Sequence, residues 1–127
     1  MFTRSETILF RHCDPAGIVF FPRFFEMAND TVEAYFAALG HDFAGLHNAN
    51  AVPTAAISAT FHAPARLGDV LTLALTLIKL GRTSLAYRIA SAAFTVEATL
   101  VHTDDTLRPT PWPDALRAKL SQDLETS

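Results

Sequence analysis

The chain has 127 residues, one cysteine and a formal net charge of −3, and half of its residues are hydrophobic. This length predicts a single domain, residues 1–127, with enough apolar side chains for a full core and no internal disulfide. There is no basic tract for nucleic acid and no apolar run near the ~20 residues that span a bilayer. We therefore expect a soluble, cytoplasmic protein.

The first part of the chain predicts a strand, a turn and a long helix. Residues 3–11 are typical of a short strand. The run Asp14-Pro15-Ala16-Gly17 predicts a turn, because proline restricts one φ angle and glycine permits a positive one. Residues 22–39 then show apolar side chains at helical spacing, with Pro22 suited to the first turn and Gly40 to the position after the end.

The second part of the chain predicts mainly strands. Leucines at every second position from Leu71 to Leu77 give the clearest alternation, and short turns between successive strands favour antiparallel pairing. The predicted elements are a loop over 40–52, strands over 53–63, 71–77, 85–89 and 94–101, and a helix over 114–124. This order predicts an α+β fold with one helix on one face of a sheet, and exposed sheet edges favour an oligomer.

Two segments carry a resemblance to a known family. The segment CDPAGIVFFP, from Cys13 to Pro22, places aspartate, proline and glycine together just before the helix, and FHAPARLGDVL, from Phe61 to Leu71, follows the second predicted strand. Together they resemble the hotdog-fold thioesterases, and within these the 4-hydroxybenzoyl-CoA thioesterase group. The similarity covers about residues 5–103.

The resemblance implies a hotdog fold, in which a curved antiparallel sheet wraps around one long central helix. It also implies a homodimer or homotetramer with active sites between subunits, and substrates that are thioesters of coenzyme A or acyl carrier protein. We therefore expect an acyl-CoA thioesterase for an aryl or a short or medium acyl chain, without a cofactor because coenzyme A is part of the substrate. The alternatives are a non-catalytic hotdog module that binds acyl-CoA or acyl carrier protein and, less favoured, a hotdog dehydratase.

The chemistry of a thioester assigns roles to three residues. Hydrolysis needs a group that attacks the carbonyl or activates water, and a donor for the oxyanion. The resemblance gives the first role to Asp14, as nucleophile or general base, although an aspartate before proline is by itself typical of a turn. The helix N-terminus supplies the oxyanion site. Pro22 has no N–H, so the donor is Phe21 or a close neighbour, and the resemblance favours Phe21. Gly17 lets the substrate approach the backbone.

Other reactive side chains nearby have more ordinary interpretations. His12 and Cys13 are adjacent in a predicted extended segment and so should point to opposite faces, which argues against a nucleophile–base pair. We expect Cys13 to be a small, partly buried side chain and His12 to line the site or tune Asp14. Glu26 on the helix is the reserve candidate for the catalytic carboxylate. The five histidines show no metal-ligand spacing.

Residues further along the chain are expected to bind the substrate. Arg66, Arg82 and Arg88 could contact the phosphates of coenzyme A, and the resemblance favours Arg82. The family carries a threonine hydroxyl at the position of Val52, so either Thr54 substitutes for it or the site lacks that hydroxyl. The predicted substrate-binding set is therefore His12, Val52, Thr54, Arg82, Thr83 and Ser84.

Overall fold

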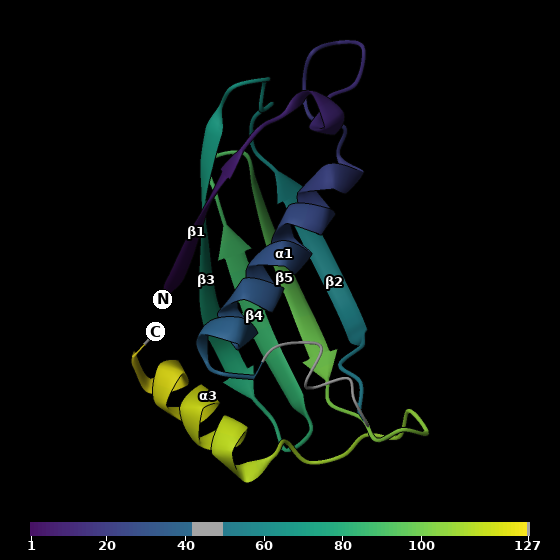
Figure 1. The fold of residues 1–127 in the computed structure, drawn as a ribbon, viewed down its shortest axis with the longest axis vertical. Coiled ribbons are helices and arrows are strands. Elements are labelled where there is room, and N and C mark those ends of the chain that lie inside the picture. Colours follow the sequence, from purple (N-terminus) through teal and green to yellow (C-terminus); the bar gives the residue numbers. More distant parts are fainter. Residues whose placement is uncertain (42–49, 127) are drawn as a thin grey trace.

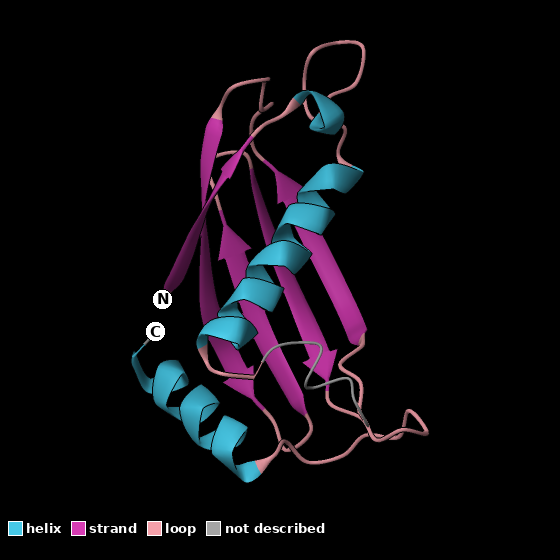
Figure 2. Cartoon of the chain, viewed as in Figure 1, coloured by secondary structure: helices cyan, strands magenta, loops and turns pink. Residues whose placement is uncertain are grey.

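A computed structural model describes residues 1–41 and 50–126 and shows an antiparallel five-stranded sheet with a long helix lying diagonally across one face (Figure 1). A second helix packs at one corner, against the sheet edge that carries the N-terminus (Figure 2). The predicted α+β class is confirmed. Most of the predicted loop over 40–52 lies outside the described residues. The elements are β1 (Phe2–Thr7), the 3-10 helix η1 (Phe10–His12), α1 (Pro22–Ala38), β2 (Thr54–Phe61), β3 (Val70–Leu80), β4 (Ser84–Ala90), β5 (Phe94–Val101) and α3 (Asp114–Thr126).

The core lies between α1 and the concave face of the sheet. Along α1, Phe24, Ala28, Val32 and Phe36 recur every four residues and are all buried, so they form one stripe that faces the sheet. The alternating leucines of β3 are buried as well, which confirms the predicted period of two. At roughly 1.5–3 kcal/mol for each large apolar side chain, this contact is the main source of stability. No described helix is long and apolar enough to cross a membrane.

The sheet order differs from simple succession along the chain. The strands run β1-β3-β4-β5-β2, so β2 pairs with β5 at one edge and not with β3. The connection 62–69 instead bonds the N-terminal segment: the Val19 N–H donates to Ala65 O at 2.9 Å and the Ile8 N–H to Asp69 O at 2.8 Å. The connection thus carries the chain past the N-terminal segment, and β3 joins the sheet between β1 and β4.

The first strand is shorter than predicted. It ends at Thr7, and residues Phe10–His12 form a 3-10 turn, so the prediction of a strand to residue 11 is wrong beyond Thr7. The His12 ring accepts the Leu9 N–H at 2.8 Å and caps this turn from within, as Glu or Gln does in a capping box. Because the Leu9 N–H donates to the His12 ring, it takes no part in strand pairing.

The two ends of α1 follow the sequence. Pro22 occupies the first turn, and Gly40, with φ +82°, takes the left-handed conformation beyond the last turn.

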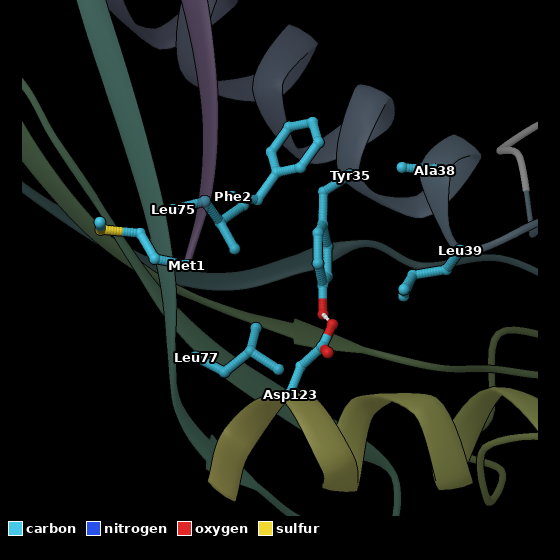
Figure 3. A pocket seen from close by; sticks show the side chains of 8 residues that line it. All are labelled: Met1, Phe2, Tyr35, Ala38, Leu39, Leu75, Leu77 and Asp123. Carbon is cyan, nitrogen blue, oxygen red and sulfur yellow. Dashed lines mark hydrogen bonds between the residues drawn. The ribbon is translucent and has the colours of Figure 1, made fainter. Parts of the chain in front are cut away.

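α3 packs against β3 and is hydrogen-bonded to α1: the Tyr35 hydroxyl donates to Asp123 Oδ2 at 2.6 Å at the edge of a small cavity (Figure 3). Burial and this hydrogen bond to the carboxylate raise the pKa of Tyr35.

Tyr35→Phe should lower the free energy of unfolding by about 1–2 kcal/mol, because the variant removes the hydrogen bond from the Tyr35 hydroxyl to Asp123 Oδ2. Tyr87→Phe is the matched control: both tyrosines are 5% exposed, but no described residue bonds the Tyr87 hydroxyl. Urea unfolding of the three proteins at neutral pH measures the difference. Equal losses for the two variants would show that the contact with Asp123 adds nothing to α3 docking.

Candidate active site

Asp14 lies in a tight loop that returns the chain from η1 to α1. Cys13 and Val19 form an antiparallel bridge, and the Asp14 N–H donates to Ile18 O at 2.9 Å. The Gly17 N–H closes the loop on Asp14 O at 2.9 Å, and Gly17 has a φ of +80°. The predicted turn is confirmed. It requires glycine for its backbone conformation, since no atom lies within 4 Å of where a Cβ would stand.

The two carboxylate oxygens of Asp14 differ in their hydrogen bonds. Oδ1 accepts the Ala16 N–H at 2.9 Å, as in an Asx turn. Oδ2 receives no hydrogen bond from the residues that the structure describes, and the side chain is partly exposed. The turn interpretation of Asp14 and the reactive one are therefore compatible, because each uses a different oxygen.

The start of α1 leaves one backbone donor without a partner. The Arg23 N–H donates to Phe20 O at 2.9 Å and the Phe24 N–H to Phe21 O at 3.0 Å, while Pro22 has no N–H. Within residues 1–41 and 50–126, no acceptor bonds the Phe21 N–H. This amide points from the positive end of the helix dipole, which suits it to bind an anion.

A cleft of about 290 Å³ lies beside the Asp14 loop, lined by Arg11, Cys13, Asp14, Pro15, Phe20 and Arg23. Sequence reasoning missed the two arginines. Arg23 stands in the first turn of α1, where a positive charge opposes the helix dipole, and this was the available signal. Its guanidinium pairs with Glu26 at 2.7 Å. The cavity of Figure 3 involves the C-terminal end of α1 and contains none of the predicted site residues.

Exposed aromatic rings adjoin the start of α1. Phe20, Phe21 and Phe61 are 50%, 55% and 48% exposed, and their rings meet edge-to-face at centroid distances of 5.7 and 5.9 Å. Phe61 was not expected in the site. It arrives through the pairing of β2 with β5, where it lies opposite Phe94, so no local sequence pattern could have indicated it.

The structure revises the surroundings predicted for Asp14. His12 is only 6% exposed and does not line the Asp14 cleft, contrary to expectation, because its ring turns to Leu9. The Cys13 thiol donates to the carbonyl oxygen of Leu9 at 3.6 Å, so His12 and Cys13 do not pair with each other. The prediction that His12 and Cys13 do not form a pair is right. The reason given for it, an extended segment, is wrong, because His12 belongs to η1. Glu26 pairs with Arg23 outside the cleft.

The other predicted substrate-binding residues lie at the opposite end of the sheet from Asp14 (Figure 1). α1 alone, with 17 residues, separates these ends by about 25 Å. Val52 is buried, and Thr83 receives the His102 N–H on its carbonyl oxygen at 2.7 Å. Of the arginines expected to contact coenzyme A, Arg66 adjoins the loop by a bridge to Ile18, whereas Arg88 pairs with Glu97. The residues far from Asp14 are Val52, Thr54, Arg82, Thr83 and Ser84.

Comparison with known proteins decides the family. A family model described as the thioesterase-like superfamily matches residues 8–120. The chain belongs to this superfamily. It is accordingly a thioester hydrolase. No protein with curated annotation matches the sequence significantly. Among the residues described for this thioesterase, no group of three or more His, Cys, Asp or Glu side chains is arranged to hold a metal ion.

Solved structures share the hotdog fold. A 1,4-dihydroxy-2-naphthoyl-CoA thioesterase from Synechocystis has a TM-score of 0.85 at 22% identity, over 98% of this chain and 97% of that chain. A Staphylococcus aureus protein in complex with CoA has a TM-score of 0.92 at 17% identity, over 98% and 84%. A gentisyl-coenzyme A thioesterase has a TM-score of 0.80 at 20% identity, over 91% and 98%.

Gly17→Ala should lower the free energy of unfolding by about 1–2 kcal/mol, because only the backbone is strained at φ +80° and no clash arises. Gly17→Asn should cost less, since asparagine tolerates the left-handed region. Chemical denaturation of both variants tests this ranking. If alanine is tolerated as well as asparagine, the positive φ is not what requires glycine here.

Proposed function

We propose that this thioesterase hydrolyses an aryl or a short- or medium-chain acyl-CoA, with Asp14 as the catalytic carboxylate and the Phe21 N–H as the oxyanion donor. One observation carries the proposal. Asp14 Oδ2 and the Phe21 N–H belong to the same loop–helix unit, and neither has a partner among the described residues. A free carboxylate oxygen and a free amide at a helix N-terminus are the two groups that thioester hydrolysis requires.

Two routes use this arrangement. In the first, Asp14 Oδ2 attacks the thioester carbonyl carbon, the C–S bond breaks, the CoA thiolate leaves, and water then hydrolyses the acyl-aspartyl anhydride. In the second, Asp14 takes a proton from water as that water attacks the same carbon, and the thiolate leaves from the tetrahedral intermediate. The Phe21 N–H donates to the carbonyl oxygen in both routes. A burst of CoA release, followed by slower turnover, would favour the anhydride.

The rings near Asp14 support an apolar or aromatic acyl group. Phe20, Phe21 and Phe61 present exposed ring surface beside the start of α1, where an aryl group can stack. Structures with the same fold include enzymes named for the aromatic 1,4-dihydroxy-2-naphthoyl-CoA and gentisyl-CoA, and one neighbour was solved with CoA. Arg11 and Arg23 add positive charge at the cleft, which suits an anionic nucleotide.

A second copy of the chain would complete the site. β2 is an edge strand without a charged residue, and nearly all of it is exposed, whereas the other edge strand, β1, carries Arg4 and Glu6. An uncharged exposed edge favours pairing with another strand. Antiparallel pairing of two β2 strands about a twofold axis would bring the Thr54 end of one copy to the Phe61 end of the other. Thr54 of the second copy, with the neighbouring Arg82 region, would thereby approach Asp14 in a dimer or a tetramer.

Asp14→Asn should reduce kcat by at least ~100-fold while the protein stays folded, because the amide can neither attack the thioester nor accept a proton from water. Glu26→Gln is the matched control and should stay near wild type, since Glu26 pairs with Arg23 outside the cleft. Thiol release from a panel of aryl- and alkanoyl-CoA esters measures both variants and ranks the acyl groups.

Near-normal activity of Asp14→Asn would overturn the assignment of the catalytic residue. Tight binding of CoA esters by the wild-type protein, without turnover of any ester in the panel, would instead favour a non-catalytic module that binds acyl-CoA or acyl carrier protein.

Ile57→Lys should convert the oligomer to monomers and reduce kcat/KM by at least ~10-fold, because it places a charge on the inner face of the edge strand. Val70→Lys is the control, since Val70 is 61% exposed, compared with 51% for Ile57, but pairs with Thr7 of β1 on the other side of the sheet from β2. Light scattering gives the mass of each variant. An Ile57→Lys protein with unchanged mass and activity would exclude β2 as the interface.

A further inference from the structure

His12 connects the two ends of the loop that carries Asp14. Its ring Nδ1 accepts the Leu9 N–H at 2.8 Å, and its own N–H donates to Leu9 O at 3.0 Å. Its carbonyl oxygen accepts the Phe20 N–H at 2.9 Å. His12 thus bonds Leu9, which precedes the loop, and Phe20, which follows it. Phe20 comes directly before Phe21, whose amide is the proposed oxyanion donor.

The contact with Leu9 determines the protonation state of the ring. A backbone N–H can only donate, so Nδ1 must be unprotonated, and neutral His12 carries its proton on Nε2. A proton on Nδ1 would place that N–H opposite the Leu9 N–H, and the Leu9 N–H would lose its acceptor. The turn Phe10–His12 depends on this acceptor, because no other side chain caps its first residue.

The edge of the His12 ring lines a small polar pocket next to the Asp14 cleft. The titratable and charged groups that share this pocket are Glu6 from β1, Arg11 from η1, and Arg23, Glu26 and Asp30 from α1. None of them bonds the His12 ring in the described part of the chain. Arg11 and Arg23 also line the Asp14 cleft, so His12 lies in the pocket next to that cleft.

We propose that His12 is a positioning residue for Asp14, acting through its Nδ1 acceptor. The inference rests on the proposed function of Asp14 and adds that the neutral ring, bonded to Leu9, sets the turn from which residues 12–14 run antiparallel to residues 18–20. His12 is not among the residues that line the cleft. Its loss should therefore displace the carboxylate relative to the Phe21 N–H, which lowers kcat more than it raises KM.

Two variants of His12 test the acceptor itself. In His12→Asn, Oδ1 can take the place of Nδ1, so kcat should stay within about 3-fold of wild type. His12→Leu has no acceptor and should lose roughly 10- to 100-fold in kcat, with KM changed by less than about 3-fold.

Tyr35→Phe controls for a loss of stability, because it removes a hydrogen bond between α1 and α3 near the C-terminal end of α1, away from Asp14. It should lower Tm without changing kcat per folded molecule. Equal kcat losses in the asparagine and leucine variants of His12, or a folded leucine variant with normal kcat, would overturn the proposal.

Amide hydrogen exchange separates this inference from the proposed function. The Leu9 and Phe20 amides should exchange faster in His12→Leu and recover protection in His12→Asn, whichever residue is catalytic. Unchanged exchange in His12→Leu would refute the positioning role even if Asp14 proves essential. Activity retained by Asp14→Asn would refute the catalytic assignment alone.

Discussion

Burial of one face of α1 against the sheet is the interaction on which the rest of the structure depends. The stripe from Phe24 to Phe36 can enter the core only if the helix lies diagonally across the inner face of β3, β4 and β5. This placement also decides where the helix begins. Its N-terminus emerges beside the connection 62–69 and the end of β1, and there the Asp14 loop is bonded from both sides. The same apolar contact that stabilises the fold thereby presents a helix N-terminus to the cleft.

The loop around Asp14 is held by main-chain hydrogen bonds, among them those from the Asp14 N–H to Ile18 O and from the Val19 N–H to Ala65 O. Asp14 Oδ2 and the Phe21 N–H, by contrast, have no partner among the described residues. Rigid support combined with two free polar atoms is the arrangement expected of a site that binds a transition state.

The antiparallel topology explains why one chain holds only part of the predicted site. α1 and β2 run in opposite directions along the sheet, so Asp14 and Phe61 share one end while Thr54 and the Arg82 turn share the other. No rearrangement within a chain can bring these ends together without breaking the core. In the proposed dimer, a twofold axis beside β2 would do so without disturbing the core, and it would cover the edge strand that carries no charged residue.

The sequence alone determined whatever depends on near neighbours. The alternating leucines of β3, the ends of α1 at Pro22 and Gly40 and the Asp14–Gly17 turn could all be predicted, because side-chain period, proline and glycine act over a few residues. The candidate carboxylate and oxyanion donor come from one such segment and were predicted with it. Only the tertiary structure decided that β2 pairs with β5, that Phe61 meets Phe21, and that the Arg82 region lies far from Asp14. These outcomes depend on contacts between residues distant in the chain, whose free energy is shared across the whole core, so no local pattern encodes them.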